Sequence, residues 1–184
     1  MKNVLIFLAE GFEEIEAITP LDLLRRIDIN AKFVSISGNR QVTGAHGVQY
    51  TADMLFDLDK AKDADAIVLP GGLPGAYHLR DHKGLQELIL HFNQEQKIIA
   101  AICAAPMILG GLGILEGKHA TIYPGMEEHL TGAIVSHESV CTDGHITTSR
   151  APGTSVDFSL RLARELAGAQ KEQWLIADIV YQKS

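Results

Sequence analysis

The sequence has few cysteines, few aromatic residues and no long hydrophobic run. Its two cysteines, Cys103 and Cys141, lie far apart and form neither a C-x-x-C pair nor a spacing typical of zinc ligands. This usage predicts free thiols and a cytoplasmic protein. No apolar stretch approaches the roughly 20 residues that span a membrane. The apolar segment 4–9 is too short for a signal peptide, and acidic residues follow it.

Basic residues are also in the minority. The chain has 16 Lys and Arg against 23 Asp and Glu, and its formal net charge is −7. Proteins that bind nucleic acids or anionic membranes need a basic surface, so we expect neither partner. Neither a Walker A loop nor G-x-G-x-x-G occurs, and no histidine forms H-x-H or H-E-x-x-H. We therefore expect no cofactor and no metal.

Apolar runs alternate with segments of helical periodicity along all 184 residues, a length typical of one domain. We expect a single domain, residues 1–184, that folds as an α/β sandwich with a mostly parallel sheet. Pro20 is expected to kink or break the first helix. The expected strands are 4–8, 32–36, 66–69 and 98–102, with hairpins within 38–51 and 140–148. The expected helices are 13–27, 84–92, 155–166 and 172–180.

Three loops follow the expected strands and should converge, because sites in such folds lie beyond the carboxyl ends of the strands. They are residues 10–16, 70–75 and 103–106. Each loop contains residues that can do chemistry.

Cys103 stands between an apolar run rich in β-branched residues and a segment typical of a helix. This layout resembles a nucleophile elbow, in which a sharp strand-to-helix turn exposes a reactive side chain. The positive end of the helix dipole should favour its thiolate. A buried structural cysteine is an equally good interpretation of this local sequence.

Glu16 lies between two apolar residues near the start of the first expected helix. If it is buried near Cys103, its pKa should be raised, and the protonated carboxyl could bond to the sulfur and move a proton. Glu13 and Glu14 are better explained as solvated residues that favour the helix start.

The glycines Gly71 and Gly72 directly follow an expected strand. A backbone N–H of this pair and that of Ala104 could form an oxyanion hole beside Cys103, although a tight turn without a ligand is the more common explanation. Arg150 could bind an anionic group of a substrate, but its segment is better explained as a helix entry, with Thr154 or Ser155 as the N-cap.

Four segments together resemble the ThiJ/PfpI superfamily, and specifically its DJ-one branch. They are AEGFEEIE at 9–16, LPGG at 69–72, AAICAAP at 100–106 and TSRAPGTS at 148–155. The resemblance implies a flavodoxin-like three-layer sandwich with helices on both faces, and usually a homodimer. It implies that Cys103 is the reactive, oxidation-sensitive cysteine and Glu16 its protonated partner. Gly72 and Ala104 match the backbone donors.

Activities assigned to this branch imply a cysteine-dependent stress-response protein that acts on a small carbonyl substrate, as a glutathione-independent glyoxalase or a deglycase. The alternative is an oxidation sensor or redox chaperone that acts through Cys103 without significant turnover. A flavodoxin-like cofactor carrier is a weaker alternative, because no loop suited to a phosphate is present.

Two departures from the family pattern matter. Protease-like relatives have a histidine directly after the nucleophile, where this chain has Ala104, which argues against a peptidase. Some members of the branch have a histidine before a nearby proline, where this chain has Tyr123. Tyrosine is a poor general base at neutral pH, which argues against strong glyoxalase turnover.

Overall fold

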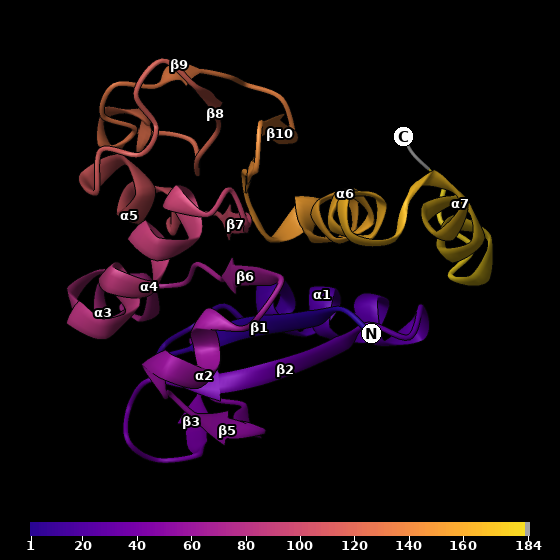
Figure 1. Cartoon of the computed structure of the whole chain (residues 1–184), viewed down its shortest axis with the longest axis horizontal. Helices are drawn as coiled ribbons and strands as arrows, with labels where there is room; N and C mark the ends of the chain where they lie inside the picture. Colours follow the sequence, from indigo (N-terminus) through magenta and orange to yellow (C-terminus); the bar gives the residue numbers. More distant parts are fainter. Residues whose placement is uncertain (183–184) are drawn as a thin grey trace.

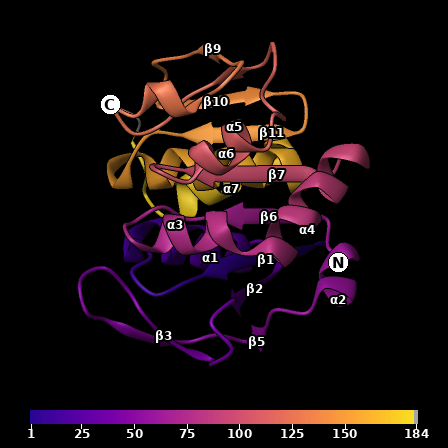
Figure 2. The same ribbon diagram turned by 90° about the vertical axis from the view of Figure 1, so that its left-hand side faces the viewer.

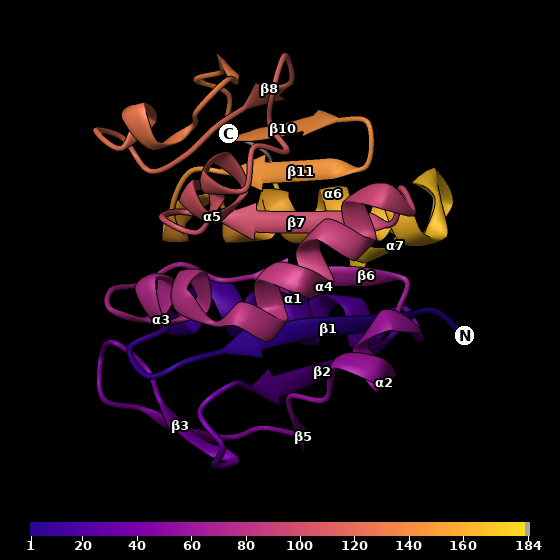
Figure 3. The same ribbon diagram turned by 60° about the vertical axis from the view of Figure 1, so that its left-hand side comes forward.

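A seven-stranded, mostly parallel sheet forms the centre of the molecule in a computed structural model that describes residues 1–182 (Figure 1). Its strands are β1 (Asn3–Leu8), β2 (Asn30–Ser35), β5 (Met54–Leu55), β6 (Ala66–Leu69), β7 (Ile98–Ile102), β10 (Val140–Asp143) and β11 (Ile146–Ser149). The strand order is β10-β11-β7-β6-β1-β2-β5. Only the edge strand β10 runs antiparallel to its neighbour (Figure 3).

Helices cover both faces of this sheet, which makes the three layers visible in Figure 1. They are α1 (Glu14–Arg26), α2 (Leu58–Lys62), α3 (Gly75–Asp81), α4 (Lys83–Gln94), α5 (Pro106–Gly111), α6 (Ser155–Ala167) and α7 (Ala169–Asp178). Helices α3, α4 and α5 lie on one face, as Figure 2 shows. Helices α1 and α6 pack together on the other, and α7 packs against α6. The fold class is therefore the one that the sequence predicts.

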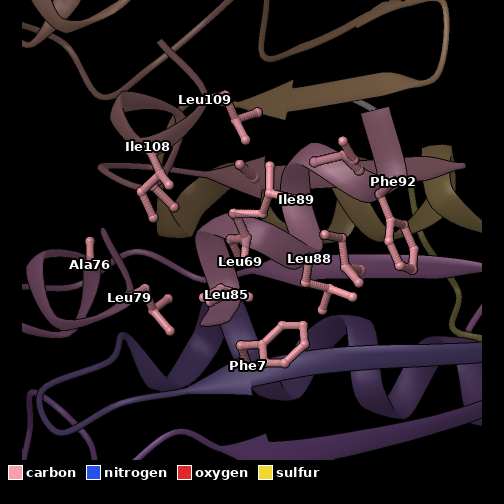
Figure 4. Packing of buried hydrophobic residues seen from close by; sticks show 14 of the residues in the cluster. Phe7, Leu69, Ala76, Leu79, Leu85, Leu88, Ile89, Phe92, Ile108 and Leu109 are labelled. Atoms are coloured by element: carbon pink, nitrogen blue, oxygen red, sulfur yellow. The ribbon is translucent and has the colours of Figure 1, made fainter. Parts of the chain in front are cut away.

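The alternation of side chains along β1 builds a core on each face of the sheet. Phe7 belongs to the cluster under α3, α4 and α5, whereas Ile6 belongs to the cluster under α1 and α6. Successive side chains of a strand point to opposite faces, so one buried strand supplies both cores. Figure 4 shows Phe7 together with Leu85, Leu88 and Phe92 of α4, all of which are fully buried.

Within the described part of the chain, four small strands and two 3₁₀ turns lie outside the central sheet. β3 (Gln41–Thr43) and β4 (Gln49–Thr51) form an antiparallel hairpin within the segment where one is expected. β8 (His119–Ala120) and β9 (Ile134–Val135) pair in parallel. The 3₁₀ turns are η1 (Glu127–His129) and η2 (Pro152–Thr154). In residues 1–182, no helix is both long enough and apolar enough to cross a membrane.

Several local expectations differ from the structure. Pro20 does not break α1, which continues past it to Arg26, because tertiary packing of the buried face of the helix, which includes Pro20, outweighs the cost of the proline. The last helix begins at Ala169 and ends at Asp178, whereas the sequence predicts 172–180. Helix α3 and the short helix α2 have no counterpart among the expected elements, because each provides too few residues for a clear periodic pattern.

Candidate functional site

Backbone hydrogen bonds join the first two of the three loops that are expected to converge. The N–H of Glu13 donates to the Gly71 carbonyl at 3.0 Å, and the N–H of Gly75 donates to the Gly11 carbonyl at 3.2 Å. Gly72 has φ +82°, and a Cβ there would collide with the backbone of residues 11–13. The glycines therefore let the two loops approach each other closely.

Cys103 occupies a sharp turn between β7 and α5. Its φ of 63° lies in the left-handed region, which costs a non-glycine residue about 1–3 kcal/mol. Hydrogen bonds on both sides hold this backbone: its N–H donates to Ser149 O at 2.9 Å, and its carbonyl accepts from the N–H of Tyr123 at 2.9 Å. This is the geometry of a nucleophile elbow.

Glu16 brings a carboxyl group to the thiol from the first helix. Its side chain is fully buried, and Oε2 accepts a hydrogen bond from Gly71 N at 2.8 Å. A Cβ on Gly71 would lie 2.6 Å from Cys103 Cβ and 2.7 Å from Glu16 Oε2. Gly71 therefore leaves the space in which the thiol and the carboxyl meet.

Burial has the largest effect on the carboxyl group and raises the pKa of Glu16 from 4.5 to about 7. The contact with the Cys103 thiol and the hydrogen bond from Gly71 lower this pKa, and the negative charge of Glu13 raises it. At neutral pH, Glu16 is therefore able both to hold and to release a proton.

Burial also raises the pKa of the Cys103 thiol, from 9.0 to about 12, with the charge and the hydrogen bond of Glu16 as further causes. The N–H groups of Gly72 and Ala104 lower it. The expected net acidification of this thiol is therefore wrong, although the backbone N–H groups at the turn do lower its pKa. Helix α5 has only six residues, and its dipole does not outweigh burial beside a carboxylate. Protonation of Glu16 removes the repulsive charge, so the two groups titrate as a coupled pair.

The structure brings most of the predicted site residues together: Cys103, Glu16, Gly71, Gly72 and Ala104 all meet at the elbow. Their roles in a reaction remain predictions.

The side chains of two further predicted residues form no hydrogen bond with this group within residues 1–182. Tyr123 touches the elbow through its backbone, and the residue as a whole is 45% exposed. The guanidinium group of Arg150 donates to the carbonyl of His137 at 2.9 Å. Thr154 occupies the N-cap of α6, but its hydroxyl contacts Ser149 and Ala151 and caps no N–H of the helix.

Sequence reasoning missed the surroundings of the first helix turn. Glu14 is buried, and the side chain of Glu13 is only 12% exposed, so the interpretation of both as solvated residues is wrong. Ile15 between them is 53% exposed. This order of buried acids and an exposed isoleucine is opposite to hydropathy, and the 43–48 turn, which lies over Glu14, accounts for the burial of that residue.

The model of the DJ-1/PfpI family matches residues 2–165. Protein dj-1beta of Drosophila melanogaster is 37% identical over 174 residues, which cover 94% of this chain and 93% of that protein. The protein DJ-1 homologs B and A of Arabidopsis thaliana are each 40% identical over 92% of this chain. The chain spans only 39% and 44% of those two plant proteins.

Solved structures agree with these relatives. The structure "Toxoplasma gondii DJ-1, oxidized" superposes with a TM-score of 0.93 at 31% identity, over 100% of both chains. The crystal structure of Drosophila melanogaster DJ-1beta has a TM-score of 0.91 at 35% identity, over 99% of both chains.

Proposed function

Since this chain belongs to the DJ-1/PfpI family, we propose that it is a cysteine-dependent stress-response protein that converts α-oxoaldehydes, or their adducts, without glutathione. The observation that carries the proposal is the elbow thiol of Cys103, which faces the buried carboxyl group of Glu16 and two backbone N–H groups. The same arrangement suits a glyoxalase or a deglycase, because both begin with a thiol that adds to an activated carbonyl-derived carbon.

The proposed reaction with methylglyoxal starts with addition of the Cys103 sulfur to the aldehyde carbon, and the thiol proton ends on the new alkoxide. The N–H groups of Gly72 and Ala104 stabilise the developing oxyanion. Glu16 then moves a proton from the former aldehyde carbon to the neighbouring carbon, while the hydroxyl proton passes from the oxygen of the first carbon to that of the second. This step oxidises the first carbon to a thioester and reduces the second to an alcohol. Water hydrolyses the thioester to lactate and restores the thiol.

Glu16 suits this proton transfer for two reasons. Its pKa of about 7 lies near the working pH, where a general acid–base is most efficient. Its second oxygen, Oε1, is buried and has no hydrogen-bond partner among the described residues, so it is the oxygen on which the carboxyl can carry its proton, since Oε2 accepts from Gly71.

Lactate formation from methylglyoxal tests the proposal. We expect wild type to form lactate above the buffer blank, and both Cys103→Ser and Glu16→Gln to fall to the blank. Cys141→Ser is the matched control and should retain wild-type turnover, because Cys141 lies on β10. Full turnover by Cys103→Ser would reject the mechanism.

A second candidate function is oxidation sensing through Cys103. The Glu16 carboxyl and the backbone N–H groups would hold the oxygens of a sulfinate, and one relative is described as oxidized. Intact mass after mild peroxide should then show two added oxygen atoms in wild type and none in Cys103→Ala. An unchanged wild-type mass would exclude this candidate.

We further propose that the chain forms a homodimer through the face of α1 that exposes Ile15, and that it works in the cytoplasm. Light scattering coupled to size-exclusion chromatography should give twice the mass of 20.0 kDa. Ile15→Asp should shift the protein toward the monomer, because the charge would enter an apolar contact.

A further inference from the structure

A buried carboxylate on the first helix turn has an oxygen atom without a partner. Glu14 is only 7% exposed. Its Oε1 accepts a hydrogen bond from the backbone N–H of His46 at 2.8 Å. Its Oε2 is buried and has no hydrogen-bond partner among the described residues. A buried carboxylate oxygen is normally paired, so this atom calls for an additional ligand.

The turn over Glu14 is shaped around the carboxyl group. A Cβ on Gly44 would overlap this carboxyl group, so only glycine leaves room for it. Backbone hydrogen bonds hold the turn, among them those from Gly44 N to Val48 O at 2.9 Å and from Ala45 N to Phe12 O at 2.8 Å. The 43–48 turn that encloses the Glu14 carboxyl is therefore a fixed part of the fold.

Two more side chains with ligand atoms stand beside Glu14. His46 Nε2 lies 3.2 Å from Glu13 Oε2. One such atom from each of Glu13, Glu14 and His46 lies within 4.8 Å of the other two. Ligand atoms around one ion, at bonds of about 2.0–2.2 Å, are separated by roughly 3–4 Å. Small side-chain rotations would therefore close this triad on a single ion.

We propose that Glu13, Glu14 and His46 bind a divalent transition-metal ion of the zinc type. Two carboxylate oxygens and one imidazole nitrogen suit this class, whereas magnesium and calcium prefer oxygen ligands alone. Because the His46 side chain is exposed to solvent, water can supply the remaining ligands of the ion. Binding requires Nε2 as a lone pair, so the imidazole is neutral and carries its proton on Nδ1. The ion would tie the 43–48 turn to α1.

Zinc titration of the full chain, followed by calorimetry, tests the site. We expect one zinc ion per chain in wild type and at least tenfold weaker binding in His46→Gln. The His46 side chain is 71% exposed, so this variant should keep its fold. The matched control is His119→Gln, which removes a histidine 3.3 Å from a single carboxylate, that of Asp143. This control should bind zinc as wild type does.

Glu14→Gln provides a second test, once circular dichroism has shown that the variant folds. It should also bind zinc at least tenfold more weakly than wild type. In a third measurement, cobalt is added in place of zinc and the absorption spectrum is recorded, because the spectrum of bound cobalt depends on its ligands. A spectrum without a thiolate charge-transfer band supports the site and separates it from binding at Cys103. Three results would overturn the proposal: no binding by wild type, equal binding by His46→Gln, or a thiolate band.

Discussion

Replacement of Glu16 by glutamine should change how the stability of the protein depends on pH. Burial raises the folded-state pKa of this carboxyl from 4.5 to about 7. Each pH unit between the folded and unfolded pKa corresponds to about 1.4 kcal/mol, so the difference is worth about 3 kcal/mol. The raised pKa stabilises the fold fully below pH 4.5, and this contribution is lost as the pH rises to about 7.

Glutamine imitates the protonated carboxyl without titrating. Its carbonyl can accept the hydrogen bond from Gly71, and its amide can donate toward the Cys103 thiol. Between pH 4.5 and 7.5, the free energy of unfolding of wild type should therefore fall by about 3 kcal/mol relative to that of Glu16→Gln. Near pH 7.5, the fold should gain more stability from glutamine at position 16 than from glutamate.

Urea unfolding followed by circular dichroism measures this difference. Both proteins should be studied at one concentration, with a reductant and a chelator present. Glu95→Gln is the matched control, because Glu95 is exposed at the end of α4, and its difference from wild type should stay nearly constant with pH. Parallel stability curves for wild type and Glu16→Gln would refute the assigned protonation of Glu16.

Two further predictions concern close packing. Gly71→Ala should lower the free energy of unfolding by about 1–3 kcal/mol and slow the alkylation of Cys103 by iodoacetamide, because the new methyl group overlaps Cys103 Cβ and the Glu16 carboxyl. A methyl group on Gly153 has no neighbour within 4 Å, so Gly153→Ala should change neither quantity. Thermal and urea unfolding measure the loss of stability. Alkylation of Cys103 in Gly71→Ala at the wild-type rate would contradict the predicted overlap. Phe92→Ala should lower the free energy of unfolding, measured with urea, by about 3–5 kcal/mol, because Phe92 is fully buried. Leu90→Ala on the same helix should cost much less, since Leu90 is 38% exposed, and equal losses would refute the assigned core.

The layered fold could be predicted from local pattern alone. Strands such as Ala66–Leu69 are continuous apolar runs, because in a parallel sheet covered on both faces every side chain is buried. The Asp143-Gly144 turn between β10 and β11 also has a clear local signal. Short elements such as α3 and the β8–β9 pair give no comparable signal, since they contain too few residues for a period.

The candidate site could be predicted as a set of residue types but not as an electrostatic environment. Strand order brings loops that are distant in sequence to one edge of the sheet, and Cys103, Glu16 and Gly71 meet there. The sequence alone suggests an acidified thiol at a helix start. The structure shows that burial beside Glu16 raises the thiol pKa instead. Desolvation depends on every neighbour of the sulfur, and no local motif encodes these neighbours.

Periodicity, turn residues and the order of short motifs along the chain determined the class of fold and the identity of the central cysteine. Only tertiary structure decided that Glu14 is buried while Ile15 beside it is exposed, and that the 43–48 turn covers the first helix. The physical reason is that secondary structure follows from interactions between residues near in sequence. Burial, pKa and ligand geometry follow instead from contacts between segments that are far apart in sequence.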